Sequence, residues 1–89
     1  RNQGDYEKAL KSHEKSLEIQ LISLPPNHPD IATTYNNIGL VYDNQGDYEK
    51  ALKAYKKALS IVRRTLPLAH PTRRVIESAI TTVGEKLSK

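Results

Sequence analysis

The sequence contains no Cys, Met, Trp or Phe, and its five aromatic residues are all Tyr. Without Cys the chain has no disulfide framework, no thiolate nucleophile and no Cys-ligated zinc, so a reducing cytoplasm is its expected location. No apolar run approaches the roughly 18 residues that suggest a membrane span, which predicts a soluble chain. The missing initiator Met predicts an excerpt or a processed piece of a longer product.

Catalytic motifs are also missing. A chain of 89 residues forms one domain at most, and a domain of this size buries only about 60–65% of its unfolded surface. No Ser, His and acidic residue form a recognisable catalytic motif, and the sequence has no Gly-rich phosphate loop. We therefore expect no enzymatic activity and no cofactor.

The net charge of +4 is unevenly distributed along the chain. Residues 1–44 contain four Lys and Arg against six Asp and Glu, whereas residues 45–89 contain ten against four. Three interpretations are open: solvated helix surfaces, an acidic partner for the C-terminal half, or attraction between complementary ends. We favour solvated surfaces, because mixed charge on lysine-rich helices usually faces water.

An internal repeat organises the sequence. Residues 2–11 recur unchanged as residues 44–53, at an offset of 42 residues. The copies then stay in phase without a gap, and a fixed period of this length predicts a solenoid in which each unit packs on its neighbour. The further matched pairs are Lys15/Lys57, Leu17/Leu59, Ile19/Ile61, Leu24/Leu66, Pro25/Pro67, His28/His70, Pro29/Pro71, Ile38/Ile80 and Val41/Val83.

Residues 48–66 have apolar side chains at steps of three and four, which predicts an amphipathic helix of about 18 residues. The first copy predicts an equivalent helix. We expect these helices to begin at Asp47 and Asp5, whose carboxylates can accept from free backbone N–H groups. Gly46 and Gly4 precede them and suit the left-handed cap of a preceding helix. The apolar positions are Tyr48, Ala51, Leu52, Tyr55, Ala58, Leu59, Val62 and Leu66.

Two further helices are predicted, from about residue 30 to 44 and from about 71 to 87. Pro29 suits a first helical turn, and Gly39 inside the first of these helices predicts a packing requirement, because interior Gly costs about 1 kcal/mol relative to Ala. The last helix departs from the pattern, which predicts a C-terminal cap. In it, Glu77, Thr81 and Gly84 replace Tyr35, Gly39 and Tyr42, while Val75, Ile76, Ala79, Ile80, Val83 and Leu87 are apolar.

These residues resemble the tetratricopeptide repeat family, in particular the 42-residue type of kinesin light chains. The resemblance rests on Tyr35, Ile38, Gly39, Tyr42, Ala51, Tyr55 and Ala58, and on residues 28–32 and 36–39. It implies an all-α fold of about four helices, with antiparallel pairs stacked as a right-handed solenoid. Residues 1–28 would hold the second helix of a first repeat and a loop, 29–70 a complete repeat, and 71–89 the divergent cap.

The resemblance also implies a scaffold for protein–protein interaction, which binds a peptide or an extended partner segment on its concave face. The first helix of each repeat lines that face, here with Thr33, Asn36, Asn37, Leu40 and Asn44. Their spacing independently places them on one side of a helix, opposite Tyr35, Ile38 and Tyr42. An Asn amide can pair with peptide backbone groups. There are two alternatives for Asn36 and Asn37: their side chains form hydrogen bonds between adjacent repeats, or they are merely solvated. A weaker second row would comprise Val75, Ser78, Ala79, Thr82 and Lys86.

The three His residues do not predict a metal site. His28 and His70 lie in equivalent loops that stacking would hold apart, and no two His have the i, i+4 spacing of a helical chelate. His13 takes the place of a Tyr on an apolar face, where a packed or half-exposed role is expected. The segment around Gly46 resembles part of a calcium loop, but the remaining ligands are missing and a turn is the better interpretation.

Two other functions remain as alternatives. The first is self-association, because Tyr6, Ala9 and His13 are expected to face solvent, and exposed apolar surface favours oligomers. The second, less favoured, is nucleic-acid binding by the basic C-terminal half. It is less favoured because most of its cations are expected on the outer side of the helix at residues 48–66, and because the Tyr rings that could stack on bases are expected to lie between helices. The cations are Lys50, Lys53, Lys56, Lys57, Arg63, Arg64, Arg73 and Arg74.

Overall fold

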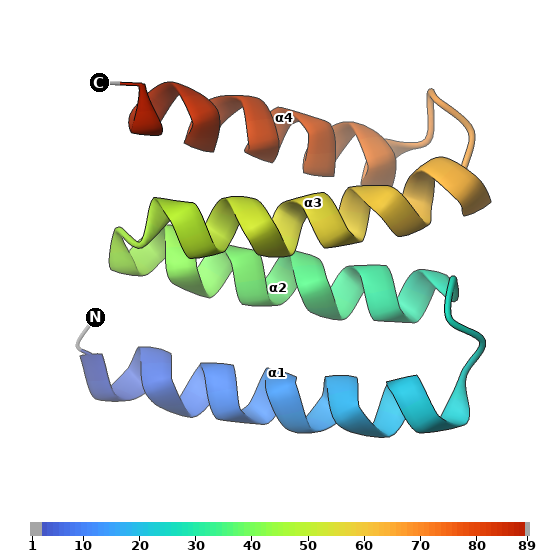
Figure 1. Cartoon of the computed structure of the whole chain (residues 1–89), viewed down its shortest axis with the longest axis horizontal. Coiled ribbons are helices and arrows are strands. Elements are labelled where there is room, and N and C mark those ends of the chain that lie inside the picture. The colour runs from blue at the N-terminus through green and yellow to red at the C-terminus, as the bar shows by residue number, and fades with distance from the viewer. Residues whose placement is uncertain (1–2, 89) are drawn as a thin grey trace.

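The computed structural model describes residues 3–88, except for the side chain of Gln3. These residues form the helices α1 (Gln3–Ser23), α2 (Pro29–Gln45), α3 (Tyr48–Thr65) and α4 (Pro71–Leu87). The helices lie side by side in chain order, each antiparallel to the one before it (Figure 1). The predicted all-α fold of about four antiparallel helices is confirmed. Its principal extents are 33 × 28 × 17 Å, so the stack is a flat layer with two broad faces.

The turn between α2 and α3 has the predicted geometry. Gly46 ends α2 in the left-handed conformation, with φ at 83°, and its N–H donates to backbone carbonyls of the last turn. Such a φ favours Gly because it has no Cβ. Asp47 then caps α3, its side chain accepting from the Lys50 N–H at 3.4 Å. The helix reversal is therefore encoded by two adjacent residues.

The equivalent turn of the first copy is not formed, which corrects one prediction. Gly4 lies inside the first turn of α1 and has no positive φ, and α1 begins at Gln3 rather than at Asp5. Gly4 and Gly46 have the same neighbours in sequence but different conformations. Gly46 follows the end of α2, whereas no helix precedes Gly4 within the described residues. Asp5 is an acidic residue of the first helical turn, where it favourably meets the positive end of the helix dipole.

His28 and His70 are the caps of the two shorter helices. The Nδ1 atom of His28 accepts from the Asp30 N–H at 3.0 Å, and that of His70 accepts from the Thr72 N–H at 3.2 Å. Each His precedes a Pro at the first helical position, which fixes a φ suited to a helix start. The two loops between repeats therefore end in the same His-Pro capping arrangement.

The hydrophobic core follows α3, which lies between α2 and α4. One cluster joins Ile31 and Ala32 of α2 to Val62 of α3 and Ile76 of α4. A second joins Ala51 and Tyr55 of α3 to Val83 of α4. The sequence pattern omitted Ala54 and Ile61, which are also buried, because a helix with neighbours on two sides buries more than one stripe.

Gly39 allows α2 and α3 to approach closely. A Cβ atom at this position would lie 2.6 Å from Cε1 and 2.7 Å from Cδ1 of the Tyr55 ring. Real Cβ atoms essentially never come this close to another atom. Tyr55 is fully buried, so its ring has little space into which to move. The packing requirement predicted for Gly39 is therefore this contact with Tyr55.

The end helices are partly covered. Tyr6, Ala9 and His13 of α1 are half-buried rather than open to solvent, because α2 covers one side of α1. In α4, Ile76 and Val83 are buried against α3, while Val75 stays exposed. Within the described part of the chain, no helix has both the length and the apolar character needed to cross a bilayer.

The two interior glycines give a matched test of the α2–α3 contact. We expect Gly39→Ala to lower the free energy of unfolding by about 1–2 kcal/mol, since overpacking costs about 1–3 kcal/mol and exceeds the gain in helix propensity of about 1 kcal/mol. Gly84→Ala should raise stability by up to about 1 kcal/mol, because nothing lies within 4 Å of its added Cβ. Urea denaturation followed by circular dichroism measures both, and equal stabilisation by the two substitutions would contradict the contact.

Candidate functional site

The five predicted site residues lie along one side of α2. Thr33, Leu40 and Asn44 are exposed, and Asn36 and Asn37 are half-buried on either edge of this line. We call these five residues the α2 strip. Ile38 is buried on the opposite side of the helix, as expected when residues two apart point in nearly opposite directions. The helix thus leaves the strip free, while α1 and α3 cover it on two other sides.

Asn36 contains an unpaired polar atom. Its side-chain oxygen Oδ1 is buried and has no hydrogen-bond partner among the described residues. Most buried polar atoms in folded proteins are paired, and an unpaired one costs about 1–3 kcal/mol. Rotation of the Asn36 side chain toward the surface would let a donor from outside the chain, such as a peptide N–H, remove this cost.

The other strip residues differ in how they are bonded. The Thr33 hydroxyl donates to the carbonyl oxygen of Pro29 at 3.3 Å, so it is held by its own helix. The side chains of Asn37 and Asn44 make no hydrogen bond within residues 3–88. Their amides therefore remain available as donors and acceptors at the surface.

Asp43 joins three helices beside the strip. Its Oδ1 lies 3.2 Å from the Lys86 Nζ of α4, and its Oδ2 accepts from the Tyr55 hydroxyl of α3 at 3.4 Å. The Lys86 Nζ also lies 4.9 Å from the centre of the Tyr48 ring. Asp43 follows Asn36 by seven residues and so shares its edge of α2. Sequence reasoning missed the role of Asp43, although this spacing could have indicated it.

The Tyr55 hydroxyl is held in its neutral form. Burial raises the pKa of Tyr55 from 10.0 to about 12, and the negative charge of Asp43 and the hydrogen bond to it act in the same direction. The phenol thus stays a donor to Asp43 across the physiological pH range. Tyr55 therefore contacts Gly39 in the interior with its ring and binds Asp43, beside the strip, with its hydroxyl.

The weaker second row lies on α4. Val75, Ser78, Thr82 and Lys86 are exposed, and Ala79 is half-buried. The ion pair between Lys86 and Asp43 brings the C-terminal end of this row to the edge of the α2 strip. The two predicted rows are thus joined at one end across α3. The opposite charges of this pair balance each other, so the polar groups that the strip offers to a ligand are mainly its neutral amides.

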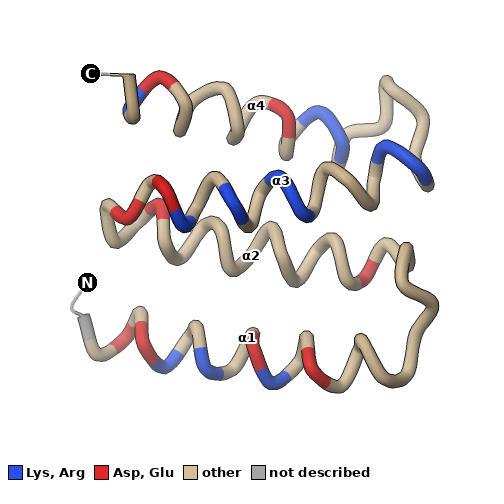
Figure 2. The backbone as a smooth tube through the Cα atoms, viewed as in Figure 1, with Lys and Arg blue, Asp and Glu red and all other residues tan. Residues whose placement is uncertain are grey.

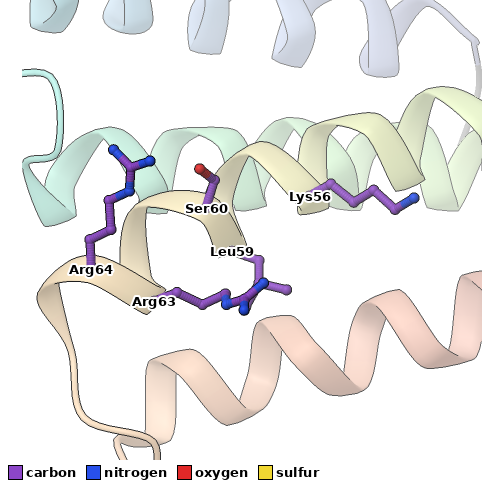
Figure 3. Close-up of a pocket in the computed structure, with 5 residues that line it drawn as sticks. All are labelled: Lys56, Leu59, Ser60, Arg63 and Arg64. Carbon is purple, nitrogen blue, oxygen red and sulfur yellow. The ribbon is translucent and has the colours of Figure 1, made fainter.

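One surface hollow lies away from the strip, on α3. It has a volume of about 620 Å³ and is lined by residues of α3. In Figure 3 its cationic side chains diverge, with Arg64 pointing away from Arg63, and Ser60 lies between Arg64 and Lys56. No group of three metal-ligating side chains occurs within residues 3–88. The lining residues are Lys56, Leu59, Ser60, Arg63 and Arg64.

The equivalent helices α1 and α3 differ in their charge. Along α3 most charged positions are basic, whereas acidic and basic residues alternate along α1 (Figure 2). Only Glu49 is acidic within α3, against six Lys and Arg. The basic character of the C-terminal half therefore comes largely from the exposed cations of α3 and from the start of α4.

Comparison with known proteins identifies one family. A family model described as a tetratricopeptide repeat matches residues 1–64, which cover α1, α2 and nearly all of α3. The match ends before α4, the helix in which Glu77, Thr81 and Gly84 replace the large and small residues of α2. No curated protein matches the chain.

The raised pKa of Tyr55 predicts a pH dependence of stability. The unfolded chain ionises this phenol near pH 10, whereas the folded chain holds it protonated up to about pH 12. Stability that is complete below pH 10 should therefore fall as the pH rises through this interval. Tyr55→Phe should lack this part of the decline, while the titration of Lys residues is common to both proteins. Urea unfolding between about pH 9 and 12 compares them, and parallel profiles would refute the assignment.

Proposed function

The chain belongs to the tetratricopeptide repeat family, and from this membership we propose that it is a non-catalytic scaffold for protein–protein interaction. In this proposal a peptide or an extended partner segment binds along the concave face, which the first helix of each repeat lines. The α2 strip is the part of that face in the complete repeat. The partner's identity is left open, because backbone recognition by amides does not select a particular sequence.

The unpaired oxygen of Asn36 is the observation that supports this mode of binding. The Asn36 oxygen is a buried acceptor without a donor, which is costly, and a peptide N–H of a bound segment would satisfy it once the side chain rotates toward the surface. The free amides of Asn37 and Asn44 offer further donors and acceptors beside it. Leu40, which is 45% exposed, adds an apolar contact between these polar groups. Together they suit a ligand that is held by its backbone.

The repeat boundaries form part of the proposal. We assign residues 1–28 to the second helix of one repeat with its loop, 29–70 to a complete repeat, and 71–89 to a divergent cap. The identical His-Pro starts of α2 and α4, 42 residues apart, support these boundaries. The same period supports the resemblance to the kinesin light chain type, with a right-handed superhelix. A cytoplasmic location is consistent with the absence of Cys.

Self-association is the second candidate. The C-terminal part of α1 exposes apolar side chains, with Ile22 at 83%, Ile19 at 62% and Leu21 at 52%. The matched position of Ile19 in the second copy is Ile61, which is buried. A surface of this kind favours contact with another protein surface. A second copy of the chain is the partner that this alternative requires.

Removal of the two central amides tests the proposed mode. Peptides selected from a random library on the wild-type protein should bind the Asn36→Ala, Asn37→Ala variant about tenfold or more weakly, because two hydrogen bonds of about 0.5–1.5 kcal/mol each are lost. Helicity should be unchanged, because neither side chain bonds within residues 3–88. Isothermal titration measures the affinities.

Asn27→Ala, in the exposed loop before α2, is the matched control and should bind as the wild type does. Equal affinity of the wild type and the double variant would disprove binding through the strip. Light scattering on the same samples addresses the second candidate. A mass that rises to a dimer without peptide, in both proteins, would favour self-association instead.

A further inference from the structure

A trough lies on the side of α2 opposite the α2 strip. Its floor is formed by Tyr35, Ile38 and Tyr42, which recur at steps of three and four along α2. Leu17 of α1 and Ala54 of α3 border this floor. Helix geometry turns these positions away from Leu40 and Asn44, which belong to the strip. The trough is therefore a separate surface of the same helix.

The size of the trough suits side chains rather than a small molecule. Its volume is about 240 Å³, below the roughly 300–1,000 Å³ typical of small-molecule sites. The floor is apolar and aromatic, so it can accept aliphatic side chains from a partner. From Tyr35 to Tyr42 the helix advances seven residues, or roughly 10 Å. A partner segment that spans the trough therefore needs about two to three helical turns.

Lysine side chains line one wall of the trough. Lys50, Lys53 and Lys57 come from α3, whereas Glu14 is the single charged residue that α1 contributes to the lining. The Lys57 Nζ lies 5.5 Å from the centre of the Tyr35 ring, and the Lys50 Nζ lies 5.6 Å from that of Tyr42. Two of the ammonium groups are thus held over the aromatic floor by cation–π contacts.

Most of this positive charge is not neutralised by the protein itself. Lys50 lies 3.6 Å from the Asp47 carboxylate. Lys53 and Lys57 form no ion pair within the part of the chain that the structure describes. Both are exposed beside an apolar surface. A carboxylate of a partner could pair with them there, and the surrounding solvent would screen this attraction less than in open water.

From this arrangement we infer that the trough binds an acidic amphipathic helix of a partner protein, about ten residues long. Its apolar side chains, at steps of three and four, contact Tyr35, Ile38 and Tyr42. Carboxylates on one flank pair with the α3 lysines, and the Glu14 carboxylate disfavours acidic groups on the other flank. Apolar stripes of this spacing are how amphipathic helices enter grooves. The inference uses a different face from the α2 strip and does not depend on it.

An RNA single strand is the competing occupant that the geometry disfavours. Sequence-tolerant binding of single strands relies on bases stacking on aromatic rings. Here ammonium groups lie over both Tyr rings of the floor. The rings are also half-buried between helices. A base needs a whole ring face to stack on and would have to displace both the lysines and the packing, whereas an aliphatic side chain needs only the part of the ring that remains exposed.

Synthetic peptides test the inference without altering the core. The probe is a 14-residue helix with Leu at steps of three and four, Glu on one flank and Gln on the other. It should bind the full chain at about 50 mM salt in a fluorescence anisotropy titration. Replacing Glu by Lys, or Leu by Gln, in the probe should each weaken binding at least about tenfold, because the first change removes charge pairing and the second removes the apolar contact.

Charge reversal on the protein locates the site. Lys53→Glu with Lys57→Glu should weaken binding of the Glu–Leu probe at least about tenfold, since like charges then face each other. Lys56→Glu with Arg63→Glu makes the same charge change on the other flank of α3 and should alter affinity less than about threefold. All four side chains are exposed, or at a surface hollow, so the helix content of both variants should match that of the wild type.

Three results would overturn the inference. Equal losses in the two charge-reversed proteins would show a diffuse attraction to the basic helix rather than binding in the trough. Equal binding of the probe that lacks Leu would show that the apolar floor is not used. Tighter binding of a 15-nucleotide oligouridine than of the Glu–Leu probe, lost with Lys53 and Lys57, would assign the trough to RNA. The Asn36→Ala, Asn37→Ala variant should bind the probe as the wild type does, which separates this test from that of the strip.

Discussion

The close approach of α2 and α3 at Gly39 is the contact on which the rest of the structure depends. The Tyr55 ring lies directly over the Gly39 backbone, at a distance that leaves no space for a Cβ atom. The same residue donates its hydroxyl to Asp43, and Asp43 pairs with Lys86 of α4. One buried side chain thus fixes the spacing of α2 and α3 and connects it, through two polar contacts, to the fourth helix.

This spacing determines which surfaces remain open. Because each helix packs mainly on the next, the stack is a flat layer, and α2 is covered on two sides only. One free side contains the α2 strip with its unpaired Asn36 oxygen, and the other contains the apolar trough beside the α3 lysines. Stability and recognition therefore use different residues of the same helix. A solenoid can vary its exposed positions without changing the contacts between its helices.

The period of 42 residues allowed the fold to be predicted in some detail, because helix spacing and turn residues are local signals. The left-handed turn at Gly46, the Asp47 cap and the packing requirement of Gly39 were all readable in this way. These local signals gave a wrong prediction where the conformation of a residue depends on the neighbouring helices. Gly4 has the same neighbours as Gly46 but lies within a helix, since a C-terminal cap requires a helix that ends before it. Capping by His28 and His70 was also not anticipated.

The candidate site was less predictable than the fold. Periodicity placed the five strip residues on one side of α2, but whether a peptide binds there is a question that helix spacing does not answer. The contact between Asp43 and Lys86 joins residues 43 positions apart, and it follows from the packing of α4 on α3 rather than from any motif. The trough was likewise hidden, because the pattern assigned Tyr35 and Tyr42 only to the contact between helices. In the structure these rings are half-buried, and they face a hollow bordered by charge.

Native-state hydrogen exchange tests the central claim, that the α2–α3 pair holds the stack together, most directly. In a nearest-neighbour stack the inner helices are covered from two sides and the end helices from one. The account predicts that the slowest amides lie in α2 and α3 and exchange through global unfolding, while those of α1 and α4 open locally and exchange at least about tenfold faster. Equal protection of all four helices, or slowest exchange in α1 or α4, would contradict it.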